Sequence, residues 1–170
     1  MSVLLSVVGK KGSGKSGVLE ELISLLGRRG FRIGVIKHLA RDDFEIDQPG
    51  KDTHRYRAYG AETVVLAGRK RFAMFSNLRE EIPLERLSAF FEGFDLVFLD
   101  GYIDGGHPKL EVHRKELGDR LLSEKAENVF AVLSDEETGM GPPHFSFDPL
   151  NPLAAFIEEK LLRKALEVTP

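Results

Sequence analysis

The sequence predicts a three-layer α/β domain with a mostly parallel sheet and a β-hairpin extension. Residues 3–8 form a nearly continuous apolar run rich in β-branched side chains, which is typical of a strand covered on both faces. Glycines interrupt residues 9–14, and four apolar residues then recur with the spacing of one helix face: Leu19, Leu22, Ile23 and Leu26. Residues 32–37, centred on Ile33, Val35 and Ile36, are the next predicted strand. This order of strand, glycine-rich loop, helix and strand predicts a βαβ unit with a right-handed crossover.

The remaining elements continue the alternation of strands and helices. Two strands over 63–67 and 71–75, joined through Gly68-Arg69, predict the hairpin. We expect further strands over 96–99, 110–113 and 129–133, and helices over 52–59, around 84–91 and over 153–161. Residues 38–50 are expected to form a loop, and four prolines make residues 135–152 irregular. Because no repeat or long linker divides the chain, we expect one domain over residues 1–170.

Composition excludes several classes of protein. The 24 Lys+Arg and 27 Asp+Glu give 24 − 27 = −3, which argues against coating nucleic acid by bulk charge. The chain has no Cys, so disulfides, thiolate nucleophiles and iron–sulfur clusters are excluded. No apolar run approaches the roughly 18–20 residues that cross a bilayer. We therefore expect a soluble, cytoplasmic protein that binds neither nucleic acid nor a membrane.

Residues 9–16 carry the motif that is most informative about fold and function. The segment Gly-Lys-Lys-Gly-Ser-Gly-Lys-Ser fits G-x-x-x-x-G-K-[ST] at every fixed position, between a predicted strand and a predicted helix. Glycines let the backbone N–H groups wrap a phosphate, and the following helix aims its positive end at the same anion. A lysine in this place neutralises the β- and γ-phosphates, and the hydroxyl of the last residue binds Mg²⁺. The predicted fold is therefore a three-layer P-loop NTPase domain.

The predicted nucleotide-binding residues follow the motif and its flank. They are Gly9, Lys10, Gly12, Ser13, Gly14, Lys15, Ser16 and Gly17. Lys10, a second lysine directly after the first glycine, resembles the deviant P-loop of SIMIBI-class NTPases, where that lysine reaches the phosphates, often those of a partner subunit. The plainer alternative for Lys10 is a solvated loop lysine. We also expect Lys15 to act on the reacting phosphates as a catalytic residue.

Three carboxylates are candidates for the rest of the site. Asp100 follows the apolar run 96–99, at the strand end where open α/β sheets bind ligands, and is expected to serve Mg²⁺ together with Ser16. Asp47, in the acidic loop after the second strand, is the candidate switch and catalytic carboxylate. Asp135, after the strand 129–133, is placed to accept hydrogen bonds from N1–H and the 2-amino group of guanine. For all three, the alternative is an acid that caps a turn or lies in solvent.

These segments together resemble the MobB family of molybdopterin-guanine dinucleotide biosynthesis adaptor proteins, which are SIMIBI-class P-loop GTP-binding proteins. The resemblance covers the P-loop, 35–38, 44–53, Arg57, Gly60-Ala61, 95–102, 108–112 and Ser134-Asp135. It implies a single GTP-binding domain that binds GTP and Mg²⁺. It also implies a homodimer that assists the guanylyltransferase of molybdenum cofactor biosynthesis and is a weak GTPase at most.

The chain departs from the family pattern at a few places. The family usually has E-G-[FY]-K where this chain has Asp100-Gly101-Tyr102-Ile103, so the carboxylate is shorter and one cation is missing. Gly17 stands where threonine is frequent, which removes a hydroxyl for the α-phosphate.

Three other functions are compatible with the motif. A small-molecule P-loop kinase would need a base for the substrate hydroxyl and an arginine-rich lid, for which only the basic patch 68–71 is a candidate. A SIMIBI-type metallochaperone GTPase would need Cys or His clusters, whereas this chain has no Cys and five scattered His. A nucleotide-binding scaffold without turnover cannot be separated from a weak GTPase by sequence.

Overall fold

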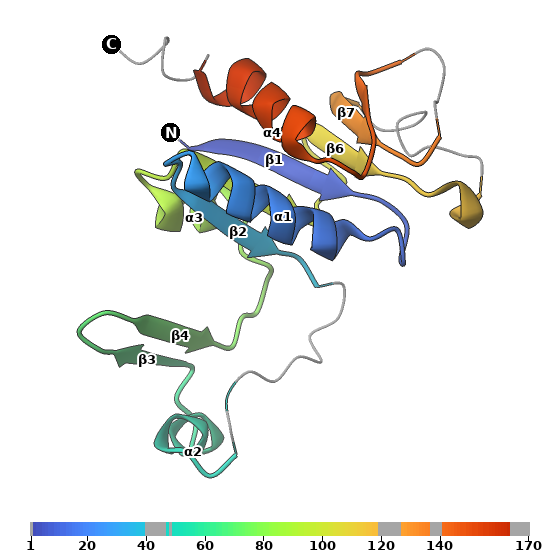
Figure 1. Cartoon of the computed structure of the whole chain (residues 1–170). Helices are drawn as coiled ribbons and strands as arrows, with labels where there is room; N and C mark the ends of the chain where they lie inside the picture. Colours follow the sequence, from blue (N-terminus) through green and yellow to red (C-terminus); the bar gives the residue numbers. More distant parts are fainter. Residues whose placement is uncertain (1, 40–46, 48, 119–126, 137–140, 164–170) are drawn as a thin grey trace. The chain divides into compact units, whose positions relative to one another are not determined.

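The computed structural model describes residues 2–39, 47, 49–118, 127–136 and 141–163. These residues belong to two compact units, one formed by residues 1–38 and 87–170 and the other by residues 39–86 (Figure 1). The elements are β1 (Val3–Val8), α1 (Lys15–Arg28), β2 (Ile33–Lys37), α2 (Asp52–Ala58), β3 (Thr63–Ala67), β4 (Phe72–Ser76), α3 (Leu84–Ser88), η1 (Ala89–Phe91), β5 (Leu96–Asp100), β6 (Lys109–Val112), η2 (Lys115–Leu117), β7 (Val129–Leu133), β8 (His144–Phe145), α4 (Asn151–Ile157) and η4 (Glu158–Arg163).

The first unit is built on a six-stranded sheet in the order β2-β5-β1-β6-β7-β8. Every neighbouring pair in this sheet is parallel, so all of the strands end at the same edge. The predicted α/β fold with a mostly parallel sheet is thus confirmed. The short strand β8 was not predicted, since residues 135–152 were expected to be irregular. Two residues that pair with β7 carry too little pattern to be recognised in the sequence.

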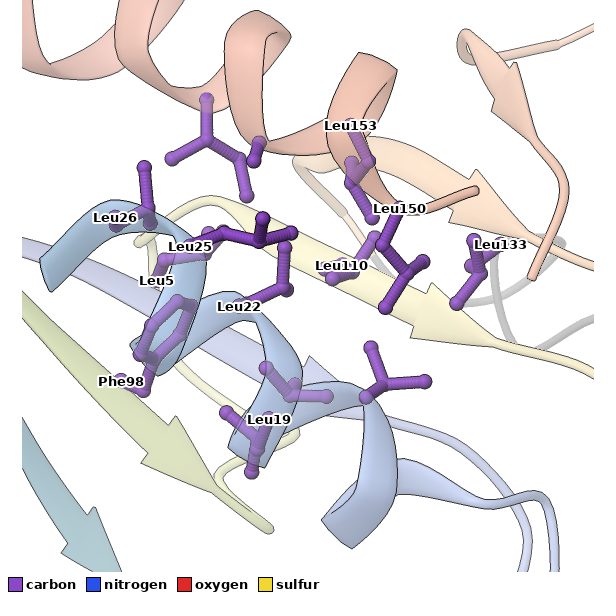
Figure 2. Close-up of a cluster of buried hydrophobic side chains, with 14 of the residues drawn as sticks. Leu5, Leu19, Leu22, Leu25, Leu26, Phe98, Leu110, Leu133, Leu150 and Leu153 are labelled. Atoms are coloured by element: carbon purple, nitrogen blue, oxygen red, sulfur yellow. The ribbon is translucent and has the colours of Figure 1, made fainter. Parts of the chain in front are cut away.

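The main core lies between one face of the sheet and two helices. Figure 2 shows leucines of α1 directed toward side chains of β1, β5 and β6, with Leu150 and Leu153 at the start of α4 closing the same cluster. Leu5, Leu22 and Phe98 are fully buried there. Leu19, Leu22 and Leu26, which define the predicted helix face, all belong to this cluster. The packing fixes α1 against the sheet, and with it the loop that connects β1 to α1.

The opposite face of the sheet is also covered. Gly34 of β2 lies against the ring of Phe91, so that a Cβ on this glycine would overlap the ring. Near the middle strands, the buried Ser6 hydroxyl donates a hydrogen bond of 2.6 Å to the Tyr102 carbonyl oxygen. Lys109 is 2% exposed, and its ammonium donates to the Gly105 carbonyl oxygen at 2.7 Å, so this buried charge is satisfied by backbone. The sheet is therefore the middle of three layers, as predicted.

The second unit consists of α2 and an antiparallel hairpin formed by β3 and β4. The hairpin was predicted with a shift of one residue at β4. The register pairs Val65 with Met74 and Ala67 with Phe72, so these four side chains share one face of the hairpin. We call them the hairpin face. Its large residues are exposed, Phe72 by 68% and Val65 by 56%.

Two expectations concern the chain as a whole. The single nucleotide-binding domain over residues 1–170 stays a prediction, since the structure describes each compact unit by itself. Among the described residues, no helix combines the length and the apolar character that crossing a membrane requires.

Candidate functional site

The loop between β1 and α1 has the geometry of a phosphate-binding loop. Gly9 lies so close to the end of β6 that a Cβ would overlap the Val112 carbonyl oxygen, which explains why this position needs glycine. Gly14 has φ of 90° and forms the N-cap of α1. A side chain at this left-handed position would be strained. The predicted motif residues Gly9, Gly12, Gly14 and Lys15 are thus brought together in one tight turn at the C-terminal edge of the sheet.

The N-terminus of α1 is open to an anion. Gly14 provides no side-chain cap, and the first turn carries no acidic residue. Ser16 and Gly17 are exposed in that turn, with their backbone N–H groups at the positive end of a 14-residue helix. The Ser13 hydroxyl is fully buried in the loop and has no hydrogen-bond partner among the described residues. Unsatisfied donors at a helix N-terminus are what a phosphate group satisfies.

Lys15 is held inside the loop that it follows. Its ammonium donates to the Gly9 carbonyl oxygen at 2.8 Å and to the Lys10 carbonyl oxygen at 2.9 Å. Burial lowers the pKa of Lys15 below its ordinary value, the Asp100 carboxylate opposes this shift, and Lys37 adds to it. A partly desolvated ammonium surrounded by glycine-rich backbone is a strong attractor for an anion.

Lys10 has a partner within the chain. Its ammonium donates a hydrogen bond of 2.7 Å to the Leu117 carbonyl oxygen, at the end of η2. Lys10 thereby connects the P-loop to the segment that follows β6. Its predicted contact with phosphates stays a prediction.

Asp100 lies at the end of β5, where the structure pairs it with Lys37 of β2 and Val7 of β1. Its side chain is 15% exposed, and its Oδ2 lies 3.3 Å from the Lys37 ammonium. The carboxylate is therefore close enough to Lys15 to influence its pKa. Together with the Ser16 hydroxyl it offers hard oxygen donors of the kind that Mg²⁺ takes, so the residues present fit a magnesium ion.

Asp135 lies two residues after β7 and is held by the segment after β6. Its Oδ1 accepts the backbone N–H of Lys115 at 2.9 Å, and its Oδ2 lies 3.5 Å from the Arg114 guanidinium. The Lys115 N–H lowers the pKa of Asp135, and Arg114 adds to this effect, so that the carboxylate is ionised at neutral pH. Next to it, the Glu136 carboxylate lies 3.6 Å from Nε2 of the buried His113.

Three residues near the P-loop were not identified from the sequence: Lys37, Arg114 and Phe147. Arg114 lies beside the P-loop, since its Nη2 is 4.0 Å from the position that a Cβ on Gly14 would take. Its guanidinium carbon lies 3.5 Å from the centroid of the Phe147 ring. Each of Lys37 and Arg114 stands at or just after a strand end, and this is the pattern that could have indicated them. Which strand ends are neighbours, however, follows only from the sheet order.

Asp47 lies in the second compact unit, next to α2. Its side chain is 6% exposed; Oδ1 accepts the Thr53 hydroxyl at 2.8 Å, and Oδ2 lies 3.5 Å from Nε of Arg57. The guanidinium of Arg57 in turn lies 5.5 Å from the centroid of the Phe75 ring. The structure thus gives Asp47 a local role, while its predicted role as a switch carboxylate stays a prediction. Residues 43–46 and 48 of the acidic loop lie outside the described residues.

The parallel sheet, the flanking helices and the glycine-rich loop after β1 define a protein with a P-loop NTPase-like α/β fold. A family model described as molybdopterin guanine dinucleotide synthesis protein B, MobB, matches residues 4–135. The chain therefore belongs to the MobB family.

Known proteins agree with this assignment along most of the chain. The chain is 32% identical to the molybdopterin-guanine dinucleotide biosynthesis adapter protein of Haemophilus influenzae, over 93% of this chain and 89% of that protein. The protein of the same name from Escherichia coli is 30% identical, over 94% and 93%. A crystal structure of molybdopterin-guanine biosynthesis protein B superposes with a TM-score of 0.72 at 26% identity, covering 95% of this chain and 99% of that one.

Proposed function

We propose that the loop 9–16 binds the triphosphate of GTP and that the protein acts as an adaptor in molybdopterin guanine dinucleotide biosynthesis. The observation that carries the binding site is the partly buried Lys15 ammonium, held by loop carbonyls beside an uncapped helix N-terminus. An anion at this place would meet the lysine, the first-turn N–H groups and the orphan Ser13 hydroxyl together. Family membership and the adaptor relatives support the pathway.

In this proposal Mg²⁺ is held by Ser16 and Asp100. The ion would neutralise charge on the β- and γ-phosphates, and Lys15 would contact the same groups. The Lys37 ammonium lies 3.3 Å from Oδ2 of Asp100, so an ion held by Asp100 would share this carboxylate with Lys37 or displace it. Gly17, next to Ser16 in the first turn, would contribute its backbone N–H. Asp47 is proposed as the switch carboxylate, and hydrolysis is expected to be weak.

Guanine selectivity is assigned to Asp135. Its carboxylate is ionised at neutral pH and is therefore an acceptor only, and the Lys115 N–H and Arg114 lower its pKa further. An acceptor-only group suits N1–H and the 2-amino group of guanine, whereas adenine lacks this pair of donors on one edge. Asp135 follows β7, the second strand from β1 on the side of β6, so that an elongated ligand could reach it from the P-loop.

The proposed partners are a second copy of the chain and the guanylyltransferase that produces the guanine dinucleotide form of the cofactor. The hairpin face supports the homodimer: Val65, Phe72 and Met74 are all large, apolar and 45% exposed or more. An exposed apolar face of this kind is typical of a surface that another chain covers. The guanylyltransferase is proposed from the family and from the names of the relatives.

The test is calorimetric titration of the purified protein with GTP and with ATP, each with Mg²⁺. We expect GTP to bind at least about tenfold more tightly than ATP. Lys15→Ala should abolish binding of both nucleotides, because the charge that faces the phosphates is lost. Lys11→Ala is the matched control, since Lys11 is an exposed lysine of the same loop. It should bind GTP like the wild type.

Two results would overturn the proposal. Full-strength binding by Lys15→Ala, in a sample with an unchanged thermal melt, would show that the nucleotide does not use this loop. A preference for ATP, or binding of neither nucleotide, would remove the guanine chemistry on which the adaptor function depends.

A further inference from the structure

Arg114 has two side-chain partners at the C-terminal edge of the sheet and lies beside the P-loop. Its guanidinium carbon lies 3.5 Å from the centroid of the Phe147 ring, which places the planar cation directly on the face of the ring. Its Nη1 lies 3.5 Å from Oδ2 of Asp135. Its Nη2 lies beside the P-loop, 4.0 Å from where a Cβ on Gly14 would stand. A surface arginine held this way keeps one orientation instead of sampling many.

The sheet order places Arg114 on the path that a nucleotide would take. The P-loop follows β1, Arg114 comes two residues after β6, and Asp135 comes two residues after β7. Because β6 lies between β1 and β7, the Arg114 side chain stands between the phosphate-binding loop and the carboxylate assigned to guanine. Parallel strands are about 4.8 Å apart, so the two ends of this path are separated by two such steps. A ligand that reaches from one to the other passes over Arg114.

The chemistry of Arg114 suits the flat face of a base. Asp135 occupies one edge of the guanidinium and offsets its charge, and Phe147 covers one face. The side chain is nevertheless 34% exposed. A guanidinium plane backed by an aromatic ring is a surface on which bases stack, and every base has such a face. The phosphates, by contrast, are assigned to Lys15 and the N-terminus of α1.

We propose that Arg114, backed by Phe147, is the stacking surface for the base of the nucleotide bound at the P-loop. This inference rests on the proposed function, and it assigns the base, not the phosphates, to the segment that follows β6. In this arrangement Asp135 has two tasks: it orients the Arg114 guanidinium and accepts the polar edge of the base. The stacking itself does not discriminate between bases, so selectivity stays with Asp135.

The protein offers a matched arrangement at the other edge of the sheet. Arg32, directly before β2, has its guanidinium carbon 4.8 Å from the centroid of the Phe94 ring. Its backbone N–H donates to Asp95 at 2.6 Å, and its Nη1 donates to the Gly93 carbonyl oxygen at 2.8 Å. These residues precede β2 and β5, so they lie at the N-terminal edge, a strand length away from the P-loop. Arg32 is therefore an arginine on a phenylalanine that no nucleotide at the P-loop would touch.

The experiment compares GTP with tripolyphosphate, which carries the phosphates without the base. Calorimetric titrations with Mg²⁺ are made on the wild type, Arg114→Lys, Arg114→Met, Arg32→Lys and Arg32→Met. We expect both Arg114 variants to weaken GTP about tenfold, which is the scale of one lost stacking contact. Tripolyphosphate should bind them as it binds the wild type. The Arg32 variants should bind both ligands normally.

Each other outcome has a definite meaning. Unchanged GTP affinity in both Arg114 variants, or equal loss for GTP and tripolyphosphate, would overturn the stacking role. If the wild type binds tripolyphosphate as tightly as GTP, the base makes no contact and the inference is wrong, while the phosphate site stands. If the wild type binds neither ligand, the proposed function fails with it. Should the Arg114 variants not fold, Phe147→Leu replaces them, and a loss confined to GTP is again the expected result.

Discussion

The two compact units differ in how far their apolar side chains are buried. In the first unit, Leu96, Val97, Phe98 and Leu99 of β5 are all fully buried, although they alternate between the two faces of the sheet. In the second unit, the apolar residues of the hairpin face remain exposed, with Phe72 at 68%. Apolar burial is the main favourable term in folding, so the first unit contains its own source of stability. The hairpin face gains that term only when another surface covers it.

This difference separates two tasks. The buried sheet fixes the strand ends, and therefore the positions of Lys15, Asp100, Arg114 and Asp135, to which the nucleotide is assigned. The hairpin carries none of these residues and offers a surface instead. We infer that the first unit is the nucleotide-binding part of the protein and that the hairpin face is the contact between copies. Three predictions test this division, from the largest effect to the smallest.

Leu22→Ala should destabilise the protein by about 2–5 kcal/mol, because Leu22 is fully buried between α1 and the sheet and its removal leaves a cavity. Met74→Ala, on the exposed hairpin face, should change the free energy of unfolding by less than about 0.5 kcal/mol when the variant and the wild type are both monomeric. Urea denaturation followed by circular dichroism, at one protein concentration, gives both values. Equal losses for the two variants would contradict the proposed difference between the units.

Much of this fold is predictable because its local patterns agree with its tertiary structure. The strand β1, the P-loop and α1 follow one another with changes of apolar period that are plain in the sequence, and the structure has them at the expected residues. The strand β8 escaped prediction because it consists of two residues and exists through its pairing with β7. Patterns within a segment do not record which other segment it pairs with.

The same limit applies to the site. The P-loop residues are adjacent in the sequence, so one motif identifies them. Arg114 and Phe147 are 33 residues apart by number, and their contact depends on the order of β6, β7 and β8 in the sheet. Lys37 and Asp100 meet for a similar reason, because β2 and β5 are neighbours. Sequence reasoning found the carboxylates at strand ends but not the cations that pair with them.

Val65→Ser combined with Phe72→Ser should convert the proposed dimer to a monomer, since both substitutions remove apolar surface from the hairpin face. Light scattering coupled to size-exclusion chromatography measures the molar mass directly. Phe90→Ser is the control, because Phe90 is 57% exposed but lies in the first unit. It should leave the dimer intact. A double variant that stays dimeric, or a wild type that is monomeric at the same concentration, would contradict the proposed contact between copies at the hairpin face.

Asp47→Asn should have the smallest effect, and one confined to the second unit. The substitution keeps an acceptor for the Thr53 hydroxyl but removes the charge opposite Arg57, which should cost about 1 kcal/mol. Amide hydrogen exchange of α2 should then become roughly fivefold faster, with β1 and β5 unchanged. Asp52→Asn is the control, since the Asp52 side chain is 74% exposed and its pairing with Arg55 contributes little. Exchange that accelerates equally in β5 would contradict an effect confined to the second unit. It would mean that Asp47 is coupled to the nucleotide-binding unit without nucleotide, whereas its proposed role as a switch requires this coupling only when GTP is bound.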